Sequence, residues 1–505
     1  MAAPRLHPEV LPQLPAEVLR PQYDRSALRP GIVHLGVGAF QRAHLGVINE
    51  AALHDSGDLA WGIVGVSLRR ADTRDALQPQ SGLYTVAVRD ADAQGAPREV
   101  LQVIGNLLEV LVAPENPGAV LERLASPETR IVSLTVTEKG YCHDPATLAL
   151  RWDDPDVAHD LENPAAPRSA VGMLVRGLAL RHARGLAPVT LMSLDNLPAN
   201  GCTLRGLVLA FAHRINPALA EWVARDCTFP NSMVDRIVPR TTDEDSARTS
   251  ARLGMADAWP VLAEPFLDWV VEDRFAAGRP AWQAGGARFV ARAEPYELLK
   301  LRMVNGTHSA LAYLGVMAGW PTVDVAVAQP ALRRYLLRLM TEEIEPTLPP
   351  LPGLDVAVYR ERLLARYANP ALQHQTRQIA MDGSQKLPQR LLGTVRQRLA
   401  SGGSIRLLAL AVAAWLHHLR GVDEAGRKFE IQDPLAGALA EALALAHAAT
   451  TSVEPTLAAQ QCTTAFCRSV PLFGELAASP AFVHAVARHW QRLDSEGVEG
   501  ALATL

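Results

Sequence analysis

One stretch of the sequence places polar residues with catalytic potential in an otherwise apolar helical pattern. Residues 296–315 (YELLKLRMVNGTHSALAYLG) contain Lys300, Asn305 and His308, and Glu297 precedes the lysine by three positions. At about 100° per residue, these four side chains fall within an arc of about 140°, so we expect them to share one face of a helix. Two apolar residues lie on the same arc, so the predicted face is mixed.

These residue types suit proton transfer at an alcohol or a carbonyl group. Removing a lysine from water lowers its pKa toward neutral pH, where the amine exchanges protons readily. An asparagine and an imidazole nearby can hold the reacting oxygen. The alternative is an amphipathic helix in which Lys300 extends to water and His308 is a hydrogen-bonded core residue. Spacing alone leaves both interpretations open.

Composition and length indicate a globular protein of more than one domain. The 505 residues exceed what one hydrophobic core normally supports. A net charge of −4 gives no electrostatic reason to expect nucleic acid or an anionic membrane as a partner. The longest apolar run, 407–416, is too short to span a bilayer, and the first twenty residues lack the apolar core of a signal peptide. Five cysteines without a CxxC pair favour a reduced, cytoplasmic protein without a zinc site.

Strands and helices alternate in the N-terminal part of the chain. We predict strands at residues 31–38, 61–68, 84–88, 130–136 and 188–194, and helices at 39–53, 118–125 and 170–184. This alternation predicts an α/β fold with a mostly parallel sheet and helices on both faces. Alanine- and leucine-rich segments dominate from about Glu294 onward. We therefore expect an α/β domain at residues 1–293 and a mainly helical domain at 294–505.

The first predicted strand ends in a glycine turn, Gly36-Val37-Gly38. Such a turn lets a pyrophosphate approach the backbone at the start of the next helix. Gln41 stands where the GxGxxG fingerprint has its third glycine, so an ordinary tight turn is the alternative. The second strand is followed by Arg69 rather than by the acid that favours NAD. An arginine there either meets the 2′-phosphate of NADP or belongs to a solvated loop.

Polar segments elsewhere are open to a functional or a structural interpretation. Residues 193–201 (SLDNLPANG) follow a predicted strand, where ligands bind in open α/β sheets, but an Asx turn without a catalytic role would look similar. In residues 229–239, Asp235 and Arg236 are either part of a site or simply paired with each other. Residues 382–386 (DGSQK) have the form of a helix-entry turn that offers a lysine to an anionic or polyhydroxylated ligand.

Seven segments, taken in order, resemble the polyol-specific long-chain dehydrogenases, the mannitol dehydrogenase family to which fructuronate reductases also belong. They are GVGAFQRAH (36–44), TVTEKGY (135–141), SLDNLPANG (193–201), FPNSMVDRIVP (229–239), EPFLDWVVED (264–273), YELLKLRMVNGTHSALAYLG (296–315) and QIAMDGSQKLPQR (378–390). The combination is far more specific than any single motif, and it favours the catalytic interpretation of the lysine helix.

The resemblance implies a Rossmann-type domain followed by a helical domain, an active site in the cleft between them, and NAD as cofactor without a metal ion. Lys300 would be the general base, and Asn196 and Asn305 would hold the oxygen that becomes partly negative. His308 would orient the substrate, and Glu297 would relay protons to solvent.

The resemblance also implies further contacts. Asp235 would support Asn196 and the lysine, and Lys386 would contact substrate oxygens. Gln378 is also an implied substrate contact. Mannitol dehydrogenases carry an arginine at this position, and fructuronate-reductase-like members carry a glutamine, as this chain does. By contrast, Asn196-Leu197-Pro198 resembles the mannitol-type form of its loop. The implied cofactor contacts are Gly36, Val37, Gly38, Ala39, Phe40, Arg69, Glu138 and Lys139.

The sequence therefore predicts an NAD(H)-dependent oxidoreductase that interconverts a ketose or keto-sugar acid and the corresponding polyol or aldonate. Fructuronate is favoured over fructose, with mannitol 2-dehydrogenase as the alternative and NADP left open. A non-catalytic nucleotide or sugar sensor is a remote third possibility, because folds of this kind persist after catalysis is lost. A sensor, however, needs no proton acceptor. The expected partner is a small sugar, polyol or sugar acid, and the expected assembly is a monomer or small homo-oligomer.

Overall fold

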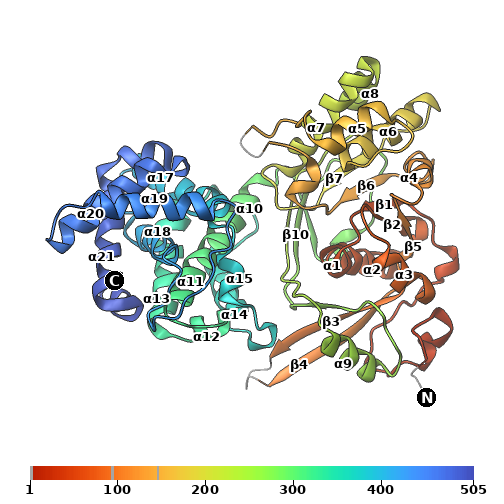
Figure 1. Ribbon diagram of the computed structural model, residues 1–505. Helices are drawn as coiled ribbons and strands as arrows, with labels where there is room; N and C mark the ends of the chain where they lie inside the picture. The colour runs from red at the N-terminus through yellow and green to blue at the C-terminus, as the bar shows by residue number, and fades with distance from the viewer. Residues whose placement is uncertain (1–3, 92–95, 145–146) are drawn as a thin grey trace. The chain divides into compact units, whose positions relative to one another are not determined.

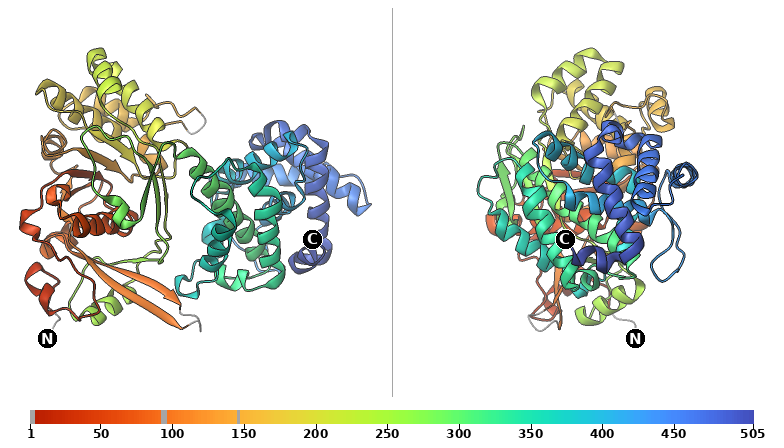
Figure 2. Two further views of the ribbon diagram at one scale, coloured as in Figure 1. Left: turned by 180° about the vertical axis from the view of Figure 1, so that it is seen from behind. Right: turned by 90° about the vertical axis from the view of Figure 1, so that its left-hand side faces the viewer.

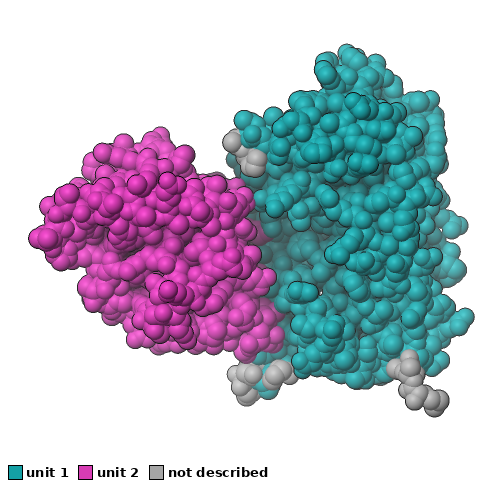
Figure 3. Space-filling model, in the orientation of Figure 1, with its two compact units in different colours: residues 1–297 teal, residues 298–505 magenta. Residues whose placement is uncertain are grey.

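The computed structural model describes residues 4–91, 96–144 and 147–505. The chain divides into two compact units, Met1–Glu297 (unit 1) and Leu298–Leu505 (unit 2), which are coloured separately in Figure 3. Each unit has its own hydrophobic core.

The centre of unit 1 is a five-stranded parallel sheet (Figure 1). In spatial order, the strands are β5 (Leu107–Val112), β2 (Ile63–Ser67), β1 (Ile32–Leu35), β6 (Ile131–Leu134) and β7 (Thr190–Ser193). Every neighbouring pair is parallel. Because β1 has β2 on one side and β6 on the other, the order reverses at β1. Open α/β sheets bind ligands at the carboxyl ends of their strands beside such a reversal.

Helices cover both faces of this sheet. Val33 and Leu35 of β1 enter a core formed with α4 (Pro117–Leu124), α6 (Ala170–Ala183) and α7 (Asn200–Ile215). Ile32, whose side chain points to the opposite face, packs in a second core with α2 (Leu45–Ser56). The predicted α/β fold of Rossmann type is confirmed.

The strand predicted at 84–88 is present, but its place in the parallel sheet and the unbroken helix at 39–53 were predicted wrongly. The strand expected at 84–88 lies outside the parallel sheet: β3 (Tyr84–Ala91) pairs antiparallel with β4 (Pro97–Ile104), and Figure 2 shows this long hairpin in orange. Apolar character marks a strand but does not identify its partner. The helix expected at 39–53 breaks at His44, whose φ of −111° and ψ of −83° separate α1 (Ala39–Ala43) from α2.

Two small sheets complete unit 1. β9 (Val261–Ala263) adds to the β3–β4 hairpin in parallel. β8 (Ser232–Asp235), β10 (Asp268–Glu272) and β11 (Ala287–Val290) form the other sheet, with β10 in the middle. Trp269 of β10 is fully buried in the same core as α2, so this sheet shares the packing of the parallel one.

Helices build unit 2. The central ones are α11 (Gly306–Met317) and α18 (Arg406–His418), which pack against each other and are buried along most of their length. α21 (Pro480–Ala503) packs against α18, and α20 (Pro455–Ser469) against α21. The longest apolar run of the sequence, residues 407–416, lies in α18 and is thus part of a core helix. In the described part of the chain, no helix is both long enough and apolar enough to cross a membrane.

Three π-helical segments interrupt the α-helices of unit 2: Lys300–Asn305, Leu339–Ile344 and Pro388–Leu392. The first packs against each of the other two. Such segments hydrogen-bond from i to i+5 and occur frequently at functional sites. The uniform α-helical spacing that we assumed for residues 296–315 is therefore wrong across 300–305.

Candidate active site

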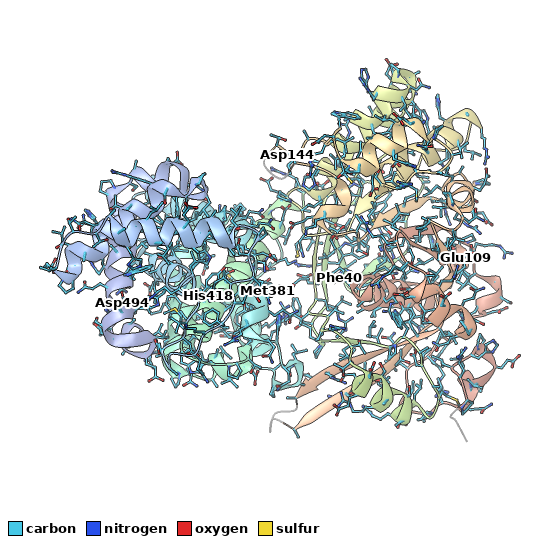
Figure 4. The ribbon with its side chains drawn as sticks, in the orientation of Figure 1. Phe40, Glu109, Asp144, Met381, His418 and Asp494 are labelled. Atoms are coloured by element: carbon cyan, nitrogen blue, oxygen red, sulfur yellow. The ribbon has the colours of Figure 1, made fainter. Side chains whose placement is uncertain are left out.

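A pocket of about 490 Å³ opens where β1, β2 and β6 end. Of the predicted cofactor contacts, five line it: Gly36, Val37, Gly38, Arg69 and Lys139. Within the described residues, the lining does not include the other three, Ala39, Phe40 and Glu138. The ring of Phe40, labelled in Figure 4, stacks on His44 with 5.0 Å between the centroids.

The glycine turn of this pocket fits a dinucleotide. Gly36 has a φ of +95°, and a Cβ there would lie 2.0 Å from the carbonyl oxygen of Thr135, so the position requires glycine. A Cβ on Gly38 would meet no atom within 4 Å, so the backbone there faces open space. A pyrophosphate can therefore approach the turn closely. Gln41, which replaces the third glycine, is buried within unit 1.

A partly buried carboxylate, that of Asp195, joins the loop after β6 to the loop after β7. It accepts hydrogen bonds from the N–H groups of Val136 (2.9 Å) and Thr137 (3.2 Å) and from the hydroxyl of Tyr141 (2.8 Å). Burial raises the pKa of Asp195, and these donors oppose the rise. Thr137 has a φ of 63°, which is strained for a β-branched residue. The carboxylate next to Asn196 thus fixes the backbone that lines the pocket.

Two more side chains hold the Asn196 loop. The Nδ2 of buried Asn200 lies 3.0 Å from the carbonyl oxygen of Ser193 and 2.9 Å from that of Ser232. The carboxylate of Glu297 accepts from the N–H of Ala199, at 3.1 and 3.2 Å. The structure therefore places Glu297, the predicted proton relay, against the loop that carries the predicted oxygen-binding asparagine.

Asp235 is the last residue of β8 and lies opposite Asp268 of β10. Both residues are buried, and Asp268 accepts two hydrogen bonds of 2.9 Å from Arg288. The guanidinium of Arg236 donates to the carbonyl oxygen of Glu264 at 3.0 and 2.8 Å. The residues Asp235 and Asp268 are thus paired across β8 and β10, and the guanidinium of Arg236 hydrogen-bonds to a backbone carbonyl oxygen.

In unit 2, Lys300 and Asn305 are the first and last residues of a π-helical segment. On an ideal α-helix, residues five apart differ by about 140° in direction, so these two residues marked the edges of the predicted polar arc. In a π-helix, residues i and i+5 are joined by a backbone hydrogen bond and lie close to the same side. Lys300 is 8% exposed. The π-helical turn therefore reduces the angle between the directions of Lys300 and Asn305, so the polar face is narrower than an α-helix would make it.

His308 follows this segment on α11 and is buried. Its imidazole stacks on Tyr367, with 4.4 Å between the ring centroids, and meets the edge of His374 at 5.9 Å. Among the described residues, its Nε2 finds no hydrogen-bond partner. Buried polar atoms without a partner are rare in folded proteins, so this nitrogen is suited to a ligand oxygen.

Two arginines, Arg366 and Arg390, act electrostatically on His308. Burial lowers its pKa well below the ordinary value, and His374, Arg366 and Arg390 act in the same direction. The imidazole is therefore neutral at neutral pH. In the sequence analysis, Arg390 appeared only as the last residue of the segment 378–390.

The third π-helical segment, Pro388–Leu392, places Arg390 near α11. The guanidinium of Arg390 donates to the hydroxyl of Ser309 at 3.2 Å. A Cβ on Gly306 would lie 2.9 Å from the carbonyl oxygen of Arg390, so the glycine permits this close approach. The two π-helical segments and one glycine thus bring Arg390 beside the helix that carries His308.

Lys386, a predicted substrate contact, donates from Nζ to the carbonyl oxygens of Met381 (2.6 Å) and Ile379 (3.4 Å). Its ammonium group also lies 4.0 Å from the carboxylate of Asp382. These contacts tie the lysine to the turn that precedes its own helix, α16 (Gly383–Leu387). Part of its hydrogen-bonding capacity is therefore used within unit 2.

Gln378, another predicted substrate contact, is exposed and lines a pocket of about 390 Å³ in unit 2. Met381 and His418, both labelled in Figure 4, line the same pocket. As far as the structure describes the chain, Lys300 and His308 do not line it.

Several residues of these networks were not singled out by the sequence analysis. Tyr141, Asp195 and Asn200 lie inside quoted motifs, so a signal existed without a role attached to it. Arg366 and Tyr367 lie in no quoted motif, and only the packing of α14 (Val356–Tyr367) places them near His308. In the described ranges, no group of three or more histidine, cysteine, aspartate or glutamate side chains is arranged to hold a metal ion.

Comparison with known proteins assigns both parts of the chain. The model of the mannitol dehydrogenase Rossmann domain matches residues 30–284, and that of the mannitol dehydrogenase C-terminal domain matches residues 292–494. The D-mannonate oxidoreductase of Escherichia coli is 47% identical over 423 residues, which cover 83% of this chain and 86% of the relative. A mannitol 2-dehydrogenase of Phaeosphaeria nodorum is 42% identical over 437 residues, covering 86% of this chain and 76% of the relative.

A solved structure supports the same assignment. The ternary complex of Pseudomonas fluorescens mannitol 2-dehydrogenase with NAD and D-mannitol superposes with a TM-score of 0.84 at 36% identity, covering 99% of each chain. The nucleotide pocket with its glycine turn fits the NAD of such an enzyme. This chain therefore belongs to the mannitol dehydrogenase family and is an NAD-dependent oxidoreductase that acts on CH–OH groups.

Proposed function

We propose that this enzyme reduces a keto-sugar acid, with fructuronate as the leading candidate, to the corresponding aldonate, and that it catalyses the reverse oxidation. The relative named D-mannonate oxidoreductase, at 47% identity, supports an aldonate as one partner of this reaction. The proposal differs from a mannitol 2-dehydrogenase assignment in one chemical respect, because its substrate carries a carboxylate.

The two arginines that act on His308 carry the proposal. Arg366 and Arg390 act electrostatically on the imidazole, and its Nε2 is buried without a hydrogen-bond partner in the described chain. A neutral ketose does not need two guanidinium groups near the residue that orients it. A carboxylate gains charge-assisted hydrogen bonds from them. Arg390, which acts on His308, is thus the first candidate for the carboxylate contact, and Lys386, whose Nζ also donates to two carbonyl oxygens, is the second.

The roles of the reacting groups follow from their chemistry and from the family. When bound, NAD(H) exchanges a hydride with the substrate carbon. Lys300 takes the proton of the secondary alcohol during oxidation and returns it during reduction. Asn196 and Asn305 donate to the oxygen as its charge develops. His308 orients the substrate as a neutral imidazole.

Two acidic residues support these groups in the proposed mechanism. Glu297 passes the proton between Lys300 and solvent while its carboxylate holds the N–H of Ala199. Asp235, buried at the end of β8, supports Asn196 and the lysine. Lys386 and Gln378 remain proposed contacts for the far end of the substrate.

Mannitol 2-dehydrogenase is the second candidate. The match to the Pseudomonas enzyme in complex with D-mannitol, with 99% coverage of both chains, favours it. The loop sequence Asn196-Leu197-Pro198 supports it as well. Fructose and mannitol are the substrates to be compared.

A steady-state panel tests the proposal. NADH oxidation is followed with fructuronate, tagaturonate, fructose, xylulose and ribulose under one set of conditions. We expect kcat/KM for fructuronate to exceed that for fructose by about tenfold or more, because one charge-assisted contact is worth about 1.5 to 3 kcal/mol. Efficient turnover of fructose or mannitol without turnover of fructuronate would establish the mannitol alternative. Tight NADH binding without turnover of any ketose or keto acid would indicate a sensor.

A further inference from the structure

The nucleotide pocket is rich in arginine where β2 ends. Arg69 and Arg70 follow this strand, and Arg168, from the segment before α6, lines the same pocket. Of the described residues that line the pocket, Asp156 alone is acidic. Asp156 belongs to α5 (Pro155–Glu162). The acid therefore does not come from the segment that follows the second strand.

Arg69 and Asp156 form a loose ion pair. The guanidinium and carboxylate atoms are 3.9 Å apart, and the two side chains are 82% and 34% exposed. Ion pairs with this exposure contribute little to stability, so a stronger anion can displace the carboxylate from Arg69. Arg70 lies 3.6 Å from Asp72, which is outside the pocket lining. Arg69 therefore differs from Arg70 in that the acid paired with it, Asp156, also lines the pocket.

The short segment after the second strand of a dinucleotide-binding domain lies near the ribose of the adenosine. A carboxylate there accepts a hydrogen bond from the 2′-hydroxyl of NAD, and a nearby arginine accommodates the 2′-phosphate of NADP. We propose that this pocket binds NADP(H) in addition to NAD(H), with Arg69 and Arg168 holding the 2′-phosphate. Asp156 limits this binding, because it pairs with Arg69 and repels the phosphate.

The charges of the pocket fit this assignment. Arg69, Arg70, Arg168 and Lys139 supply four cations against the one carboxylate of Asp156. The 2′-phosphate adds about two negative charges, and a guanidinium binds it through two parallel hydrogen bonds. The Arg69–Asp156 contact thus sets the ratio of the two affinities, since each member of the pair favours a different ribose substituent.

Binding measurements test the proposal without any sugar substrate, so the result is separable from the proposed function. NADH and NADPH are titrated by fluorescence against the full chain and against three variants: Arg69→Ala, Asp156→Asn and Arg225→Ala. Arg225 is a matched control, because it is 70% exposed, pairs with an acid and lies on α8 (Pro217–Asp226). 2′,5′-ADP and 5′-AMP are used as competitors to isolate the phosphate contribution.

We expect the unmodified protein to bind both nucleotides and to prefer 2′,5′-ADP over 5′-AMP. Arg69→Ala should weaken NADPH binding more than NADH binding, by about tenfold in the ratio. Asp156→Asn should strengthen NADPH binding severalfold, and added salt should weaken NADPH binding more steeply than NADH binding. Arg225→Ala should leave the ratio unchanged. Equal losses of both nucleotides in Arg69→Ala, or no NADPH binding even in Asp156→Asn, would overturn the proposal.

Discussion

Unit 1 and unit 2 would contribute to the proposed chemistry in different ways. In unit 1 the backbone shapes the site: the turn at Gly36 and Gly38 leaves room for a nucleotide, and Asp195 holds the strained loop at Thr137. In unit 2 side chains shape it, and their directions depend on one π-helical turn. A site built from backbone tolerates side-chain changes such as Gln41 for the third glycine. A site built from side chains such as Lys300 and Asn305 depends on the directions in which one helix points them.

The largest effect should come from Lys300, the proposed general base in unit 2. We expect Lys300→Ala to lower kcat by on the order of 10²-fold or more, because the general base is lost. NADH binding should persist, since the nucleotide pocket lies in unit 1. Initial rates and fluorescence titration measure the two properties separately. Lys428→Ala, at an exposed lysine of unit 2, is the control. Near-normal turnover in Lys300→Ala would remove the base assignment.

Arg390 and Lys386 separate two ways in which unit 2 can supply a cation. Arg390→Met should raise KM for a keto acid about tenfold or more and change KM for fructose less, because a charge-assisted contact is lost. Lys386→Met should act in the same direction with a smaller effect, since Nζ already donates to Met381 and Ile379. Steady-state kinetics with both substrates measure the difference. Equal changes for both substrates would contradict a carboxylate contact.

The two glycines of the turn test whether backbone shapes the unit 1 site. Gly36→Ala should destabilise the fold by about 2 kcal/mol or more, because the position has a positive φ and no room for a Cβ. Gly38→Ala should leave the melting temperature nearly unchanged and weaken NADH binding, because its Cβ would enter only the open space of the pocket. Thermal unfolding and NADH titration distinguish the two variants. A stable Gly36→Ala protein with normal NADH affinity would contradict the backbone account.

The loop contact of Asp195 should have a smaller effect. Asp195→Ala leaves the N–H groups of Val136 and Thr137 without their acceptor, and we expect about tenfold weaker NADH binding. Tyr141→Phe removes one donor and leaves both backbone contacts, so its effect should be about threefold at most. Titration of both variants measures this order. A larger loss in Tyr141→Phe than in Asp195→Ala would show that the hydroxyl, and not the loop clamp, matters.

The unit 1 fold was largely predictable because its signals are local. β1, the glycine turn and the following helix lie within about thirty residues, so the βα rhythm is visible in the sequence. The place of β3 was not predictable. Its run of apolar residues marks a strand, but its pairing with β4 and β9 depends on residues that are distant in the sequence.

The candidate residues of unit 2 could be named from the sequence, but their geometry could not be predicted from it. The types and spacing of Lys300, Asn305 and His308 indicated a shared face, and the order of motifs indicated the family. The π-helical turn between Lys300 and Asn305 packs against a second π-helical segment, Pro388–Leu392, nearly ninety residues later. Local sequence preferences cannot predict a contact between segments so far apart in the chain. For the same reason, the electrostatic influence of Arg366 on His308 was invisible in the sequence.

The pH dependence of the rate in both directions tests the central claim, that Lys300 gives and takes the proton, most directly. The pKa of His308 is lowered well below its ordinary value, so this imidazole stays neutral above about pH 6 and produces no step there. We expect kcat/KM for alcohol oxidation to rise between about pH 6 and 10 as Lys300 loses its proton, and ketone reduction to fall over the same range. A flat profile in both directions would contradict the assignment of Lys300 as the acid and base.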